Sequence, residues 1–277
     1  MTHGDDIDPL SEIVFVLDRP QDVINVGAVV RLLGNFGLSR LRLVEPAAFD
    51  PACILTIARR GNAVLTRTER HSNLESALSD CAFVLGTTKR TRALDRPVLT
   101  PRQAAPALLA VAAAGVAQAA GGGRLAAVLF GPEDFGLSND ALDRCHAILQ
   151  IPSIPQDASL NLAQAALLVA YELRLSALSL TSDSTAESSA MAADASVFLK
   201  AVVTEKRLAI GDETEAMFTA LRRMLWALNP ENVEGRVLTT MARLRALLLR
   251  AVPRADEAVL LTRLFDHIAH LSKSKET

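Results

Sequence analysis

Aromatic residues are scarce in this chain, and long uninterrupted apolar runs are missing. Only 4% of its 277 residues are Phe, Trp or Tyr, although 50% are hydrophobic. The core must therefore be built from Ala, Leu, Val and Ile, a composition typical of α/β layers and alanine-rich helices. No run reaches the roughly 18 apolar residues of a membrane span, so we expect no membrane association.

Cysteines and metal-ligand clusters are sparse as well. Cys53, Cys81 and Cys145 lie too far apart for metal-ligand or redox spacing, which fits a reducing cytoplasm. His146 follows Cys145, but no second group of His, Cys or acidic residues accompanies the pair, so we expect a buried structural role and no metal site. Residues 1–9 are acidic and contain no apolar run, so we expect a cytoplasmic protein without a signal peptide.

The net charge of −2 is not typical of a nucleic-acid-binding protein, but the basic residues are clustered. Seven arginines lie between residues 222 and 254, against two glutamates. A second cluster comprises Lys89, Arg90, Arg92, Arg96 and Arg102, opposed only by Asp95. Each cluster is either a solvated face or a phosphate-binding surface.

The first 178 residues alternate strand-like and helix-like segments, which predicts parallel strands joined by crossover helices. The expected strands are 13–17, 41–44, 82–85, 125–130 and 147–151. The expected helices are 25–35, 73–80, 101–114, a short helix capped at Ser138 or Asn139, and 160–178. The last helix is apolar on most sides, so we interpret it as partly a dimer surface.

Residues 179–193 are rich in Ser, Thr, Ala and Asp, a composition that predicts a linker. Beyond them, apolar residues repeat at helical spacing in the segments 217–228, 237–248 and 259–268. We therefore expect an α/β domain (1–178), a linker (179–193) and a small all-helical extension (194–277) whose polar faces carry the arginines.

Three short strings follow strand-like runs and carry the polar groups of a candidate site: Asn25–Arg31, Gly131–Leu137 and Ser159–Ala163. In open α/β sheets, ligands bind in the crevice at the carboxyl ends of the strands. Glu133 could bind a ligand, orient an arginine or cap a helix, and Asn25, Ser159 and Asn161 could simply be helix caps. The chain has neither the glycine pattern of a dinucleotide loop nor a Walker A string.

In this order and at these separations, the strings resemble the SPOUT class of RNA methyltransferases, and within it the TrmJ-type tRNA 2′-O-ribose methyltransferases of the TrmH branch. The resemblance rests on Asn25-x-Gly-x-x-x-Arg31, Phe130-Gly-Pro-Glu-Asp-Phe-Gly-Leu137 and Ser159-Leu-Asn-Leu-Ala163, and extends through Tyr171-Glu172. It implies a SPOUT-type sheet with a trefoil knot, a homodimer with its site at the subunit interface, and S-adenosylmethionine as methyl donor. Pattern reasoning alone would not propose a knot, since threaded chains are nearly absent among folds.

The resemblance also implies roles for individual residues. The donor site is expected to comprise Thr87, Thr88, Lys89, Gly131, Ile151, Ser159, Leu160 and Asn161. The catalytic residue is expected to be Arg31, assisted by Asn25, Glu133, Ser159 and Asn161. The basic clusters are expected to bind RNA, chiefly through Arg90, Arg92, Arg222, Arg223, Arg243 and Arg245.

Two mechanisms are open for Arg31. It could accept the proton of the 2′-hydroxyl, although a guanidinium, with a pKa above about 12, is a poor base. Alternatively, it could bind the neighbouring phosphate and stabilise the developing alkoxide. The implied target is a cytidine or uridine at the first nucleotide of the tRNA anticodon loop (position 32).

Three other functions remain open at this stage. The same chemistry could act on rRNA or on another tRNA position. A catalytically silent, knotted RNA-binding dimer is disfavoured because the five catalytic-type residues occur together. A small-molecule enzyme on an ordinary doubly wound sheet would have no use for the arginine-rich helical extension.

Overall fold

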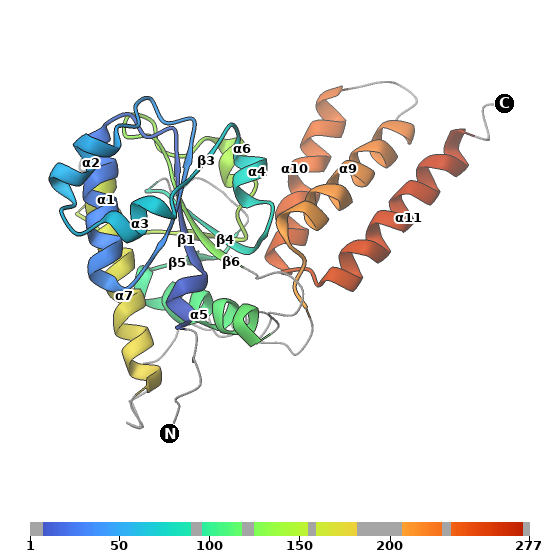
Figure 1. Cartoon of the computed structure of the whole chain (residues 1–277). Helices are drawn as coiled ribbons and strands as arrows, with labels where there is room; N and C mark the ends of the chain where they lie inside the picture. Colours follow the sequence, from blue (N-terminus) through green and yellow to red (C-terminus); the bar gives the residue numbers. More distant parts are fainter. Residues whose placement is uncertain are drawn as a thin grey trace.

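The centre of the protein is a seven-stranded sheet in which all paired neighbours run parallel, in the order β3-β2-β1-β6-β4-β7-β5. The computed structural model describes residues 8–89, 96–117, 125–154, 159–181, 207–228 and 234–273. The strands are β1 (Ile13–Asp18), β2 (Arg40–Val44), β3 (Glu69–His71), β4 (Cys81–Thr87), β5 (Val98–Leu99), β6 (Leu125–Phe130) and β7 (Ala147–Leu149). The predicted α/β class with parallel strands is therefore confirmed (Figure 1).

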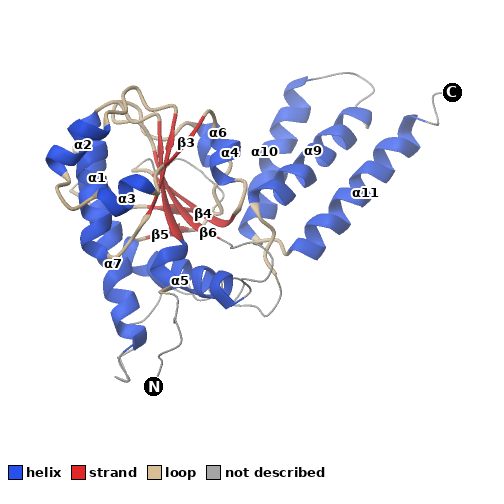
Figure 2. Ribbon diagram, viewed as in Figure 1, coloured by secondary structure: helices blue, strands red, loops and turns tan. Residues whose placement is uncertain are grey.

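Helices cover both faces of the sheet (Figure 2). They are η1 (Pro9–Glu12), α1 (Val23–Phe36), α2 (Pro51–Ile57), α3 (Asn62–Thr66), α4 (Leu74–Leu78), α5 (Pro101–Ala117), α6 (Asn139–Leu142), α7 (Leu162–Thr181), α9 (Gly211–Ala227), α10 (Glu234–Arg250) and α11 (Ala255–Lys273). Helices α1, α5 and α7 pack on one face, and α4 and α6 on the other. The helices α9, α10 and α11 lie beside α4 and α6 and form their own small core; we call them the three-helix module.

Two hydrophobic clusters explain why the central strands are apolar throughout. Phe15 and Leu17 of β1 point into the cluster below α1, α5 and α7, whereas Val14 and Val16 point into the cluster below α4 and α6. Successive side chains of a strand alternate between the faces of a sheet, so a strand covered on both faces needs apolar residues at every position. Residues 13–17 of β1 and all of β6 are accordingly apolar and buried, and the one charged residue, Asp18 at the end of β1, pairs with Arg19.

The structure corrects the expected start of the first helix. The N-cap is Asp22, whose carboxylate accepts a hydrogen bond from the backbone N–H of Ile24 (2.8 Å), so Asn25 is not the cap. The helix ends where predicted, because Gly37 adopts a left-handed conformation with φ 79°. Five short elements were not predicted: η1, α2, α3, β3 and β5.

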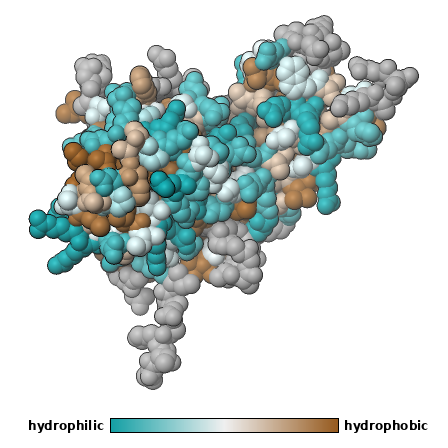
Figure 3. Space-filling view, turned by 45° about the horizontal axis from the view of Figure 1, so that its top comes forward, coloured by the Kyte–Doolittle hydropathy of each residue, from teal (hydrophilic) through white to brown (hydrophobic). Residues whose placement is uncertain are grey.

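Helix α7 is long and apolar enough to cross a membrane by length and composition alone. In the fold it packs against α1 and α5, with Ala166, Val169, Ala170 and Leu173 buried. Its other side exposes Leu167, Leu168, Tyr171, Leu175 and Leu178. In Figure 3, hydrophobic residues gather on the side of the molecule where α1, α2 and α7 lie. The helix continues to Thr181, past the expected domain end, and most of the expected linker lies outside the described residues.

Candidate active site

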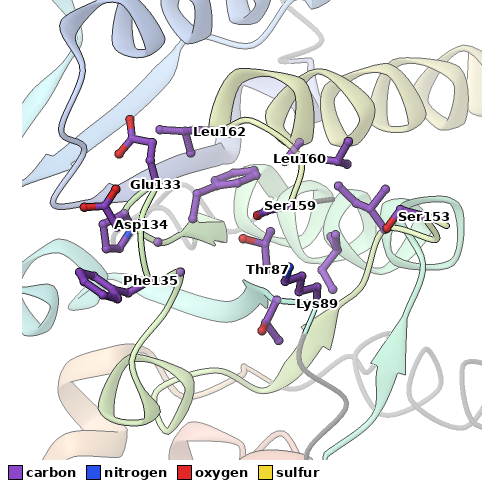
Figure 4. Close-up of a pocket in the computed structure, with 17 residues that line it drawn as sticks. Thr87, Lys89, Glu133, Asp134, Phe135, Ser153, Ser159, Leu160 and Leu162 are labelled. Atoms are coloured by element: carbon purple, nitrogen blue, oxygen red, sulfur yellow. The ribbon is translucent and has the colours of Figure 1, made fainter. Parts of the chain in front are cut away.

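A pocket of about 240 Å³ lies at the carboxyl ends of three adjacent strands, β6, β4 and β7. We call it the strand-end pocket. Its lining comes from the segments that follow these strands and from the start of α7: Thr87, Thr88, Lys89, Phe130, Gly131, Pro132, Glu133, Asp134, Phe135, Gly136, Leu149, Ile151, Ser153, Ser159, Leu160, Leu162 and Ala165. Figure 4 shows Thr87 and Ser159 between the Glu133–Phe135 segment on one side and Ser153 on the other.

The loop after β6 is closed tightly on itself. A Cβ atom at Gly131 would lie 2.3 Å from the backbone of Gly136 and Leu137, so only glycine fits there. Gly136 has a φ of 65°, which also favours glycine. The loop therefore turns sharply and carries Glu133 to the rim of the pocket.

Glu133 joins the three sequence strings into one hydrogen-bonded chain. Its Oε2 accepts the backbone N–H of Gln21 (2.9 Å), and its Oε1 accepts the side-chain amide of Asn25 (2.8 Å) and, more weakly, the backbone N–H of Asp22 (3.4 Å). The Oδ1 of Asn25 in turn accepts Nδ2 of Asn161 (2.9 Å). Residues more than 100 positions apart are thereby fixed at one rim of the pocket.

The environment of Glu133 keeps it ionised. Burial works to raise the pKa of this carboxyl, but the hydrogen bonds from Asn25 and from the backbone N–H groups of Gln21 and Asp22 outweigh it and lower the pKa. A carboxylate only accepts hydrogen bonds, so Glu133 orients the amide of Asn25 rather than donating a proton. Asn161 additionally caps α7 through the N–H of Ala163 (2.8 Å), so its capping and site interactions occur together.

The pocket brings together most of the residues expected to hold the donor. Seven of them line it: Thr87, Thr88, Lys89, Gly131, Ile151, Ser159 and Leu160. Asn161 lies beside the pocket, where its side chain is hydrogen-bonded to Asn25. Sequence reasoning missed the lining residues Phe135, which lies within the string Gly131–Leu137 and is 73% exposed, and Ser153, which follows β7.

Arg31 does not line the pocket of its own chain. It is exposed on α1, and Nη1 makes one long contact, 3.5 Å, to the carbonyl oxygen of Ile57. Gly27 permits a close approach, but of α2: a Cβ there would lie 2.8 Å from Cδ1 of Ile57. The opening string therefore presents Asn25 to this pocket and Arg31 to the surface.

The expected RNA-binding arginines divide into three groups. Arg222, Arg223 and Arg243 are exposed, with Arg223 paired to Asp266 at 3.1 Å. Arg90 and Arg92 lie outside the described residues. The side chain of Arg245 is only 14% exposed and is bound by Glu215, so we remove it from the expected RNA surface. Arg96, in the second basic cluster, is buried against Asp143.

Cys145 and His146 are both buried, which confirms the expected structural role. The backbone N–H of Val84 donates to Nδ1 of His146 (3.1 Å). Burial lowers the pKa of His146 to about 3 and raises the pKa of Cys145 to about 12, so the imidazole and the thiol are both neutral near pH 7. Within the described residues, His, Cys, Asp and Glu form no group of three that could hold a metal ion.

Comparisons with known proteins agree with this geometry. Residues 12–171 match the SpoU rRNA Methylase family. The chain is 31% identical over 268 residues to tRNA (cytidine/uridine-2′-O-)-methyltransferase TrmJ of Salmonella typhimurium, covering 96% of this chain and 100% of that protein. It is 37% identical over 166 residues to tRNA (cytidine/uridine/adenosine-2′-O-)-methyltransferase TrmJ of Pseudomonas aeruginosa, covering 60% of this chain and 62% of that protein.

A solved structure shows the same similarity in three dimensions. The crystal structure of TrmJ from Z. mobilis ZM4 matches with a TM-score of 0.69 and 30% identity, covering 92% of this chain and 98% of that one. The resemblance inferred from the three strings is therefore confirmed. The chain belongs to the SpoU family of RNA methyltransferases, enzymes that use S-adenosylmethionine.

Proposed function

We propose that this protein methylates the ribose 2′-hydroxyl of a tRNA nucleotide, with the strand-end pocket as the site of the methyl donor. The hydrogen bonds that connect Glu133, Asn25 and Asn161 carry the proposal, because they join all three strings at one rim of that pocket. The names of the TrmJ relatives support tRNA as the substrate. Within this proposal the target is a cytidine or uridine at the first nucleotide of the anticodon loop, and the enzyme acts in the cytoplasm.

The residues of the pocket fit S-adenosylmethionine chemically. Leu149, Ile151 and Leu160 offer apolar walls for an adenine ring, and the hydroxyl of Ser159 offers a polar contact for a ribose or amino-acid group. Lys89 is the one cationic side chain among the described residues that line the pocket, and it suits the carboxylate of the donor. When bound, the donor supplies an electrophilic methyl group on a sulfonium, and the protein has to hold the attacking oxygen in line with it.

Arg31 completes the site from a second copy of the chain in this proposal. Arg31 and Ile24 lie on the exposed side of α1, next to the exposed apolar side of α7. Pairing two copies through these helices buries that apolar surface and can bring Arg31 of one copy toward the pocket of the other. There its guanidinium binds the phosphate beside the target ribose and stabilises the developing alkoxide. The trefoil knot, and domain limits at 178 and 194, belong to the same proposal.

Mixing two inactive variants tests whether Arg31 acts across the dimer. Arg31→Ala and Glu133→Gln each inactivate their own chain, but a mixed dimer contains one site with both native residues. After joint refolding at equal amounts, half of the dimers are mixed and each has one intact site, so about a quarter of the wild-type activity is expected. Activity no higher than that of the separate variants would place Arg31 in the pocket of its own chain or outside the mechanism.

RNA binding is assigned to the outer face of α10. Arg236, Arg243 and Arg250 are exposed and spaced seven residues apart, which places them on one side of the helix at steps of about 10.5 Å. The only acidic residue of α10 is Glu234, in its first turn. Exposed guanidiniums at this regular spacing suit contacts with successive phosphates, which give affinity without reading the base.

Transfer of labelled methyl from S-adenosylmethionine to an anticodon-stem transcript tests the function directly. Label is expected on the ribose transcript and absent when the target nucleotide is a deoxyribonucleotide; equal labelling of both would contradict 2′-O-methylation. The family description names rRNA, which supports a second candidate substrate. Ribose-methyl mapping of tRNA and rRNA from cells with and without the gene separates the two.

A further inference from the structure

The three-helix module meets the sheet at a close backbone contact. The backbone N–H of Asp212, at the start of α9, donates to the carbonyl of Ser79 (2.9 Å), which follows α4. A Cβ atom at Gly211 would lie 2.2 Å from the carbonyl oxygen of Leu78, so the two backbone segments approach as closely as glycine allows. This contact fixes one end of α9 on the part of the chain that forms the sheet and its covering helices, which we call the sheet domain.

The second contact between the three-helix module and the sheet domain depends on the carboxylate of Glu215. Glu215 of α9 accepts hydrogen bonds from Arg144, which belongs to the sheet domain (3.2 Å), and from Arg245 of α10. Arg245 also donates from Nε to the carbonyl of Asp143 (2.8 Å) and stacks over the ring of Phe218, 4.3 Å from its centroid. The side chains of Glu215, Arg144 and Arg245 are 24%, 20% and 14% exposed, so solvent screens these charges less than on an open surface.

The segment held by Arg245 continues directly into the wall of the strand-end pocket. On its other side, the buried guanidinium of Arg96 binds the carboxylate of Asp143 (3.2 Å) and donates to the carbonyl of Leu142. Four residues beyond Asp143 the chain enters β7, and its last residue, Leu149, and Ile151 just after it both line the pocket. The three-helix module is therefore attached to the same segment that builds the pocket.

We propose that Glu215 is a positioning residue that holds the three-helix module in one orientation, so that α10 and the strand-end pocket engage the same RNA molecule. The proposal rests on the proposed function, because it takes RNA as the ligand of both surfaces. Two surfaces that bind one rigid partner reinforce each other only when their spacing matches that partner. Holding that spacing in the free protein also lowers the ordering cost of binding.

Glu215→Ala tests this role, with Glu12→Ala as the matched control. Glu12 is similarly buried and pairs with Arg40 at 2.9 Å, but this pair lies entirely within the sheet domain. For Glu215→Ala we expect a KM for the tRNA transcript raised about tenfold, with kcat changed less than about twofold and an unchanged Kd for S-adenosylmethionine. Small-angle scattering should show a larger radius of gyration for Glu215→Ala only, and Glu215→Asp should restore part of the loss.

The outcomes separate this inference from the proposed function. Wild-type scattering together with a wild-type KM for RNA in Glu215→Ala would overturn it, as would an equal loss of donor affinity, which would mean that the contact acts on the pocket itself. If Glu215→Ala does not fold, Arg144→Met breaks the same contact from the sheet side. If the wild-type protein methylates no tRNA, the proposed function fails, while scattering still decides whether Glu215 fixes the module.

Discussion

Both ends of the central sheet carry arginines and carboxylates, but the two ends use them differently. Near the amino ends of β3 and β4, the side chain of Arg42 is 6% exposed and donates to Asp80 (2.6 and 2.8 Å), Glu69 (2.9 Å) and the carbonyl of Ala77 (2.8 Å). At the carboxyl ends, Glu133 organises neutral amides, and Arg31, about two turns into the helix that follows β1, is left exposed.

The difference lies in how many hydrogen bonds and ion pairs each guanidinium makes within the protein. A buried guanidinium bound by two carboxylates is stable only as a set, because removing one partner leaves an uncompensated charge. Burial raises the pKa of Asp80, but the hydrogen bonds and charge of Arg42 outweigh it and lower the pKa overall. An exposed guanidinium can instead bind an outside phosphate. A guanidinium fully bound within the protein, such as that of Arg42, indicates a role in stability. An exposed guanidinium, such as that of Arg31, indicates a role in the reaction.

Removing the exposed arginine should have the largest effect on catalysis. For Arg31→Ala we expect about a thousandfold loss of kcat, because the phosphate contact and the stabilisation of the alkoxide both disappear. The Kd for S-adenosylmethionine, measured by calorimetry, should stay unchanged, and so should the urea midpoint. Arg60→Ala, another exposed arginine, is the control. Parallel losses of donor affinity and turnover would contradict the assignment.

Removing the buried Arg42 should lower stability and leave catalysis unchanged. Arg42→Met leaves Asp80 and Glu69 without their shared partner and should lower the free energy of unfolding by about 3 kcal/mol. Urea denaturation measures this loss, and methyl transfer per folded molecule should remain at the wild-type level. A large drop in kcat with unchanged stability would break the comparison between the two ends of the sheet.

Glu133→Gln sharpens the comparison within the carboxyl end. An uncharged amide cannot accept from Gln21, Asp22 and Asn25 as the carboxylate does, so we expect kcat to fall about a hundredfold. Glu45→Gln changes an exposed carboxylate that does not line the pocket and should leave kcat within about twofold of wild type. Equal losses in the two variants would show that general charge, rather than the hydrogen-bonded chain, matters.

The buried His146 predicts a pH dependence of stability. Its pKa is about 3 in the folded protein against 6.5 for the free side chain, so below pH 6.5 the unfolded chain binds a proton that the folded protein does not. Its stabilising contribution is present above pH 6.5 and is lost as the pH falls, by up to about 1.4 kcal/mol per pH unit. Unfolding experiments from pH 7 to 5 should show a flatter dependence for His146→Gln; identical slopes would contradict the burial argument.

The smallest effect is expected on α10. Arg243→Gln removes one of three similar phosphate contacts, so the KM for tRNA should rise only a few-fold and the salt dependence of RNA binding should weaken by about one unit of slope. Filter binding between low and moderate salt measures this change. Unchanged slopes for both Arg243→Gln and Arg236→Gln would remove α10 from the RNA surface.

Residues that act through local pattern could be predicted from the sequence. The strands at 13–17, 41–44, 82–85, 125–130 and 147–151 all exist, because buried parallel strands are continuous apolar runs. Elements as short as α3 and β5 carry too few residues to show a period and were missed. Asp22, rather than Asn25, caps α1, which spacing alone could not show.

Contacts between distant segments could not be predicted. The segment 259–268 was expected to pack through Val259, Leu260, Leu264 and Ile268. In α11 the first three are exposed, whereas Leu261 and Phe265 pack, because the position of α9 selects the face. Arg245 is equally instructive. A long arginine stem can pack against an aromatic ring while its head group binds a carboxylate, and a helical pattern does not distinguish this from a solvated arginine.

The central place of β6 has a consequence for how the chain is made. β6 joins β3-β2-β1 on one side to β4-β7-β5 on the other, with Ile13 paired to Ala126. Before residue 130 leaves the ribosome, β1 and β4 both present open edges, and no strand pairing of the native sheet joins its two halves. These edges are therefore exposed for most of the time that the domain takes to emerge during synthesis. The sheet can be completed only when β6 has been made.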